Sequence, residues 1–163
     1  MPRCVLVLGC WVALVAGCAA SGVPSNSACR DLEYDKAGPS RAQFLPCAGE
    51  MVAVLEELDP QVQAAASGDP QARSKGQDSV RRLRALMNAA GGRKLLERWN
   101  DESLMDFNLD INNAMTHYEA FYMVRIVDGT SPTATHSQDA ARAEANAASR
   151  RADEAINVYR GLK

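Results

Sequence analysis

Residues 104–121 read LMDFNLDINNAMTHYEAF, and the spacing of the apolar side chains in this stretch decides the fold. The apolar positions recur at alternating steps of three and four residues, which is the periodicity of an α-helix with one buried face. They are Leu104, Phe107, Ile111, Ala114, Tyr118 and Phe121. Because further apolar residues widen this face, we expect a central helical segment over roughly residues 93–127 that contacts two neighbours. Within it, Asp101 is a suitable cap for a new helix after a shorter one.

Two helices are expected before this segment. The first begins near Pro46, because proline is tolerated in a first turn, and it ends at Ser67-Gly68. Asp59-Pro60 predicts a kink or a short break inside it. The second helix begins at Asp69-Pro70, a cap residue followed by proline, and ends at the glycine-rich Ala90-Gly91-Gly92.

A fourth helix is expected from about Gln138 to Leu162, with alanine along one face. These alanines are Ala141, Ala145, Ala148, Ala152 and Ala155. Alanine lets a neighbouring helix approach closely but buries little apolar area, so the bulky aromatic residues of 104–121 suit this face. With no strand pattern and short connections, the sequence predicts an all-α, up-and-down bundle of about four helices.

The start of the chain has the pattern of an export signal. Arg3 precedes an uncharged, largely apolar run from Cys4 to Ala16. This is the length of the apolar region of a signal peptide, and it is shorter than the roughly 20 residues that span a bilayer. The run ends in Leu14-Val15-Ala16-Gly17-Cys18, with two small residues directly before a cysteine.

This ending resembles the lipobox of bacterial lipoproteins. The resemblance implies cleavage before Cys18, a diacylglyceryl thioether on its sulfur and an acyl chain such as palmitate on its amino group. Residues 1–17 would be the signal peptide, 18–40 a short lipidated tether and 41–163 the bundle domain. Ala19 then favours the outer membrane, facing the periplasm, if the source has two membranes. Cleavage after Ala20 by the general signal peptidase, or an uncleaved anchor, are the alternatives.

The predicted signal peptide, here called the leader, also assigns a role to each of the five cysteines. Cys4 and Cys10 lie inside it, and Cys18 would carry lipid. Cys29 and Cys47 remain as an even pair in an oxidising compartment, which predicts one disulfide. Two unpaired thiols are the alternative.

Composition and charge exclude several functions. After residue 17 the chain has 17 Lys plus Arg against 20 Asp plus Glu and no long basic run, which argues against binding to nucleic acid or to anionic lipid. No phosphate-binding glycine loop, nucleophile elbow or haem motif is present. We therefore expect no cofactor and no enzymatic activity.

One polar cluster could hold a ligand. Asp106, Asp110, Asn113 and His117 step by four, three and four residues, so they share one stripe of a helix. Oxygen and imidazole groups at this spacing could bind a divalent cation, although a solvated face or a hydrogen-bonded histidine explains the stripe equally well. His136 is expected in a loop.

Aromatic residues beside this stripe allow a second kind of site. Trp99, Tyr118, Phe121 and Tyr122 could line an apolar groove or belong to the core. The sequence thus favours a membrane-anchored envelope lipoprotein that acts as a non-enzymatic interaction, scaffold or accessory module with a protein partner. A periplasmic binding module for a metal ion or small ligand is the alternative.

Overall fold

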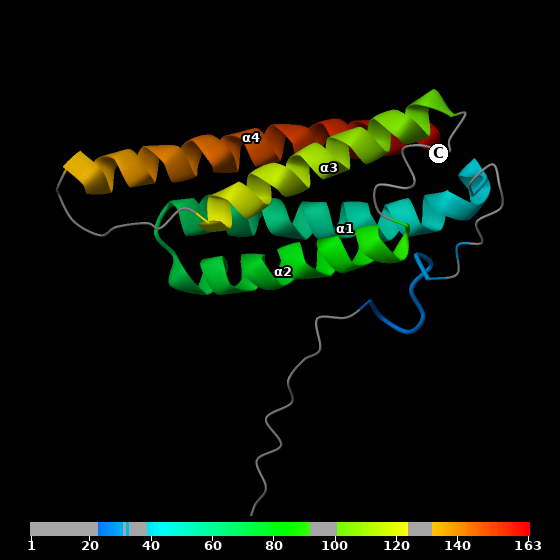
Figure 1. Ribbon diagram of the computed structural model, residues 1–163, viewed down its shortest axis with the longest axis horizontal. Helices are drawn as coiled ribbons and strands as arrows, with labels where there is room; N and C mark the ends of the chain where they lie inside the picture. The colour runs from blue at the N-terminus through cyan, green and yellow to red at the C-terminus, as the bar shows by residue number, and fades with distance from the viewer. Residues whose placement is uncertain (1–22, 31, 33–38, 92–100, 124–131) are drawn as a thin grey trace, which may run out of the picture.

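Four helices form the bundle in a computed structural model that describes residues 23–30, 32, 39–91, 101–123 and 132–163. They are α1 (Arg41–Ala66), α2 (Pro70–Ala89), α3 (Glu102–Met123) and α4 (Pro132–Leu162). Successive helices run in opposite directions, and the α3–α4 layer covers the α1–α2 layer (Figure 1). This confirms the prediction of an all-α bundle of about four helices.

The start of α1 differs from the prediction. The Ser40 hydroxyl accepts a hydrogen bond from the Gln43 amide, while the Gln43 side chain accepts one from the Ser40 amide. This capping box starts the helix at Arg41, several residues before Pro46. The predicted break at Asp59-Pro60 is wrong, because α1 continues through Pro60 to Ala66. Fully buried side chains before and after Pro60 stabilise this part of α1 and offset the missing amide donor.

The predicted start of α2 is confirmed. The Asp69 carboxylate accepts hydrogen bonds from the amides of Gln71 and Ala72, with Pro70 as the first helical residue. Ala89 ends the helix, and Gly91 follows with a φ of 90° that suits glycine.

The third helix begins where Asp101 predicts a new start. The Asp101 carboxylate accepts a hydrogen bond from the Leu104 amide at 3.3 Å, and α3 runs from Glu102. The shorter helix expected before it, over 93–100, lies outside the described residues. The start of α4 at Gln138 is wrong, since the helix already begins at Pro132, a residue that suits the first helical position. Position 136 therefore lies in a helix rather than in a loop.

The core is built where the α3 and α4 patterns meet. All six apolar residues of the 104–121 seam are buried, and so are the five alanines of α4. The α3–α4 interface is the most extensive in the bundle, followed by α1–α2. Phe107 connects the layers, with its ring centroid 6.0 Å from that of Phe44 on α1 and 6.2 Å from that of Tyr159 on α4. None of the described helices has the length and hydropathy needed to cross a membrane.

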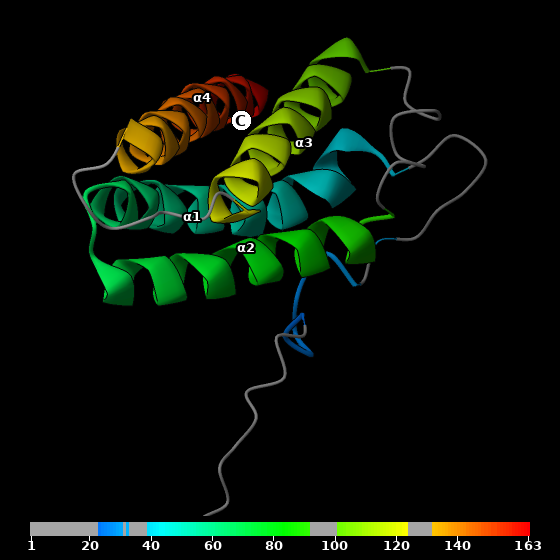
Figure 2. The same cartoon turned by 60° about the vertical axis from the view of Figure 1, so that its left-hand side comes forward.

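A glycine allows the narrow contact between α2 and α3. Figure 2 shows α3 crossing the α1–α2 layer at an angle, and this pair has far less contact than α3–α4. A Cβ atom at Gly76 would lie only 1.7 Å from the Tyr122 hydroxyl oxygen, so no larger residue fits. Next to it, the Arg73 guanidinium stacks over Tyr122 at 5.7 Å and Phe121 at 5.5 Å.

We expect Gly76→Ala to lower the free energy of unfolding by about 2 kcal/mol, because the new methyl group forces Tyr122 out of its place. Urea denaturation of the variant measures this loss. Gly161→Ala is the matched control: nothing lies within 4 Å of a Cβ there, so its stability should stay unchanged or rise slightly. If the losses of stability caused by Gly76→Ala and Tyr122→Ala simply add in the double variant, the two residues do not interact. That result would contradict the assigned contact.

Candidate functional site

Residues 23–30, here called the docked segment, lie against the α1–α2 layer. Glu50 of α1 holds them with both carboxylate oxygens: it accepts hydrogen bonds from the Ser27 hydroxyl at 2.6 Å and from the Ala28 amide at 2.7 Å. The Ser27 oxygen accepts a further bond from the Cys29 amide, and Ser27 is only 2 % exposed. Hydrogen bonds to a charged carboxylate are stronger than neutral ones, so this contact fixes the segment in place.

A covalent link reinforces the same contact. The sulfur atoms of Cys29 and Cys47 lie 2.08 Å apart, which is disulfide distance, and both residues are fully buried. The pairing predicted from the cysteine count is thus borne out by the structure. Cys47 and Glu50 are one turn apart on α1, so one helix face holds the segment in two ways. Closing a loop of this length contributes on the order of 3 kcal/mol.

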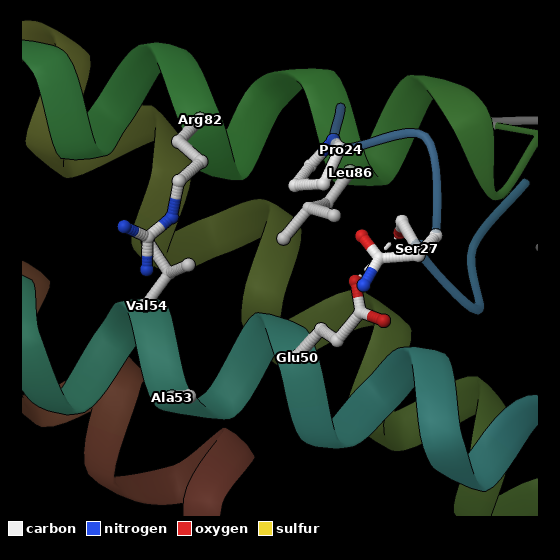
Figure 3. Close-up of a pocket in the computed structure, with 8 residues that line it drawn as sticks. Pro24, Ser27, Glu50, Ala53, Val54, Arg82 and Leu86 are labelled. Atoms are coloured by element: carbon white, nitrogen blue, oxygen red, sulfur yellow. Dashed lines mark hydrogen bonds between the residues drawn. The ribbon is translucent and has the colours of Figure 1, made fainter. Parts of the chain in front are cut away.

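A groove of about 340 Å³ opens between the docked segment, α1 and α2 (Figure 3). Its lining is mostly apolar, with Glu50 near the docked segment and Arg82 further along α2. The lining residues are Pro24, Asn26, Ser27, Glu50, Ala53, Val54, Arg82 and Leu86. The Arg82 guanidinium also pairs with Glu57 at 2.9 Å. The groove therefore combines an apolar floor with one cationic group.

Part of the tether expected over residues 18–40 is held against the bundle as the docked segment. Residues 18–40 carry the composition of a flexible connection, yet residues 24–30 form hydrogen-bonded turns: the Ser27 amide donates to Pro24 and the Arg30 amide to Ser27. Sequence reasoning missed Glu50 and Ser27 as partners. The only sequence feature that points to these two residues is that Ser27 lies two positions from Cys29 and Glu50 lies three positions from Cys47.

The polar stripe of α3 faces α4. His117 Nδ1 lies 2.8 Å from a carboxylate oxygen of Glu144, and Asp110 lies 3.8 Å from Arg151. Asp106 is exposed and Asn113 is half-buried. Among the residues that the structure describes, no three His, Cys, Asp or Glu side chains are grouped closely enough to hold a metal ion.

The carboxyl group of Asp110 is electrostatically unfavourable at this position. Burial raises its pKa above the ordinary value, and the nearby Glu154 and Asp106 raise it further, while Arg151 opposes them. The charged form is therefore less stable in the folded protein than in the unfolded chain.

The aromatic residues belong mainly to the core. Tyr118 and Phe121 are fully buried, and Tyr122 is half-buried; Trp99 lies outside the described residues. Burial raises the pKa of Tyr122 to about 12, with Arg73 opposing the rise, and burial also raises the pKa of Tyr118. Tyr118 and Phe121 therefore do not line an open groove.

A second polar contact that the sequence did not indicate joins α1 to α4. The Ser149 hydroxyl donates to Asp59 and accepts from the Gln63 amide group at 2.9 Å. Asp59 and Ser149 lie 90 positions apart in the chain, so no local sequence pattern predicts this contact.

Comparisons with protein-family models, curated proteins and solved structures found no match to this chain.

We expect Glu50→Gln to loosen the docked segment, because an amide group replaces one of the two accepting oxygens. Limited trypsin digestion should cut after Arg30 about tenfold faster, as expected for loss of a hydrogen bond worth about 1.5 kcal/mol to a charged group. Glu56→Gln is the matched control, since Glu56 is exposed and pairs with Arg160 of α4 at 3.6 Å, away from the docked segment. Equal cleavage in both variants would contradict this role of Glu50.

We expect Asp110→Asn to raise the melting temperature at pH 7 by about 1–3 °C, because it removes a charge that the folded state disfavours. The gain should vanish near pH 3, where the carboxyl is protonated in both states. Calorimetry at the two pH values tests this, with Asp139→Asn, an exposed carboxylate on α4 that does not act on Asp110, as the control. A lower melting temperature at pH 7 would mean that the Arg151 contact outweighs burial.

Proposed function

We propose that this chain is a lipid-anchored lipoprotein of the cell envelope, and that its bundle serves as a non-enzymatic scaffold or accessory module for a protein partner. The observation that carries the proposal is the Val15-Ala16-Gly17-Cys18 pattern followed, after a short connection, by the docked segment. Val23 follows Cys18 by only five positions, a reach of at most about 17 Å. A lipid on Cys18 would therefore hold the bundle close to the membrane.

A scaffold role is supported by how the described polar groups are used. Glu50 holds the docked segment, and Glu57 of α1 pairs with Arg82 of α2. Asp59 of α1 accepts a hydrogen bond from Ser149 of α4, and Glu144 of α4 contacts His117 of α3. These contacts join one element to another and so stabilise the bundle.

A surface for the partner is available on α3. Three large apolar side chains are exposed among the described residues, and all three lie on this helix: Met105, Leu109 and Met123. Met105 and Leu109 are one turn apart and so form one small apolar patch. A pair of exposed apolar residues is smaller than the patches that usually mark protein contacts, so the partner surface is proposed at Met105 and Leu109 as the position to test.

The alternative, a periplasmic binding module for a metal ion or small ligand, has weaker support. His117 and Asp110 of the polar stripe have partners on α4, and a metal ion would have to displace Glu144 or include it. The groove beside the docked segment is the better candidate for a small ligand, on account of Arg82.

The anchor is tested by Cys18→Ser in the native host. We expect the precursor to accumulate unprocessed, palmitate labelling to disappear and the protein to leave the membrane fraction. Cys10→Ser, within the expected leader, is the matched control and should behave as the wild type. Normal processing with retained palmitate on the Cys18→Ser variant would overturn the lipoprotein assignment.

The scaffold role is tested by crosslinking from Leu109, replaced by a photoreactive amino acid, in intact cells. A single partner in stoichiometric yield, lost when Met105→Lys is added to the photoreactive variant, supports the proposal. Asn157 on α4, also exposed, is the control position. A protein that carries a co-purified ion and crosslinks to nothing would instead favour the binding module.

A further inference from the structure

The near-neutral charge of the chain hides a strong separation of charge between helices. Helix α2 carries five basic residues against one acidic residue, Asp78. The basic residues are Arg73, Lys75, Arg81, Arg82 and Arg84. Helix α3 carries four acidic residues and no Lys or Arg. Since α2 belongs to one layer and α3 to the other, the two broad faces of the bundle differ in charge (Figure 1).

The acidic residues of α1 lower the net charge of the α1–α2 layer, but most of them contact elements other than α2. Glu50 holds the docked segment, and Asp59 and Glu56 contact Ser149 and Arg160 of α4. Only Glu57 reaches an α2 cation, Arg82.

Four of the five basic side chains of α2 are exposed, while Arg73 is half-buried against Phe121 and Tyr122 of α3. The side chains of Arg81, Arg82 and Arg84 are 44–57 % accessible, and Lys75 is exposed as well. These arginines pair with Asp78, Glu57 and Glu119. Exposed pairs of this kind are weak, so the guanidinium groups can still bind phosphate groups that approach from outside.

The docked segment lies on the same side of the molecule. Figures 1 and 2 both place it against the α1–α2 layer, on the side away from α3 and α4. Its Pro24 and Leu86 of α2 line the same groove. The chain therefore leaves the bundle toward Cys18 from the side that carries the basic helix.

We propose that α2 lies along the membrane surface and contacts the head groups of anionic phospholipids. The inference rests on the proposed lipid on Cys18, which would bring the bundle within about 17 Å of the surface. This reach lets α2 come within a Debye length of the surface, about 8–10 Å, where an anionic leaflet attracts the basic side chains of α2 and repels the acidic ones of α3. The partner surface on α3 then points away from the membrane.

The test uses the full processed protein, with its lipid verified by mass spectrometry, in vesicles of phosphatidylethanolamine and phosphatidylglycerol at three to one. A nitroxide is attached to a cysteine introduced at Ser74 or Asn88, both exposed on α2 and about 21 Å apart along it. Asn146 and Asn157, exposed on α4, are the control positions. Head-group lipids that carry nickel report which label is near the surface.

We expect both α2 labels to relax at least twofold faster in the presence of the nickel lipid, with no change at the α4 positions. Contact at Asn88 alone would mean that the bundle stands on end, and contact at α4 would mean that it lies the other way up. Either result overturns the inference and leaves the lipid anchor intact. Absence of lipid on Cys18 would overturn both the proposed lipid anchor and the inference that rests on it.

A charge reversal tests the contribution of the basic face. Lys75→Glu with Arg81→Glu should abolish the effect of the nickel lipid at Asn88, whereas Arg142→Glu with Arg150→Glu on α4 should not. In vesicles of phosphatidylcholine the wild-type effect should fall at least twofold. An effect that is independent of both changes would show that the anchor alone, without α2, determines the position of the bundle.

Discussion

The alanines of α4 set the distances on which the rest of the bundle depends. Five of them are buried along one face, and their small side chains allow α3 to pack more extensively on α4 than any other pair of helices packs. Because alanine contributes little area, the bulk of this layer has to come from α3. Phe107, Tyr118 and Phe121 supply it, and Phe107 extends to Phe44 of α1. The α3–α4 contact therefore also determines how the two layers meet.

This arrangement has a consequence on the other side of α3. Helix α3 packs mainly on α4, and the contact between α2 and α3 is far smaller. It depends on Gly76, which leaves room for the Tyr122 ring beneath Arg73. A glycine inside a helix is by itself destabilising relative to alanine. The structure shows that the missing side chain is what lets α3 approach.

Local signals predicted helix starts well where one residue decides them. Asp69 and Asp101 accept hydrogen bonds from the amides that follow, and such caps are visible in a short stretch of sequence. The start of α1 was missed because Pro46 resembles a first-turn residue, while the real cap is Ser40 with Gln43.

The candidate site was predicted in part for similar reasons. Cys29 and Cys47 pair because they are the two cysteines left after the leader and the lipidation site are set aside, so counting is enough. The contact of Ser27 with Glu50 spans 23 residues and follows no periodicity, so it needs the fold. Two members of the polar stripe, His117 and Asp110, have their partners Glu144 and Arg151 on a different helix, which no spacing within α3 reveals.

The disulfide also decides where a mechanical load would enter the bundle. If the chain is pulled at Cys18, tension passes through the docked segment to Cys29 and crosses the sulfur bridge to Cys47. It thereby bypasses residues 30–46, including the capping box at the start of α1. The force then acts within α1 next to Glu50, where the helix is packed on its neighbours. The first turn of the helix, which would unwind most easily, carries none of it.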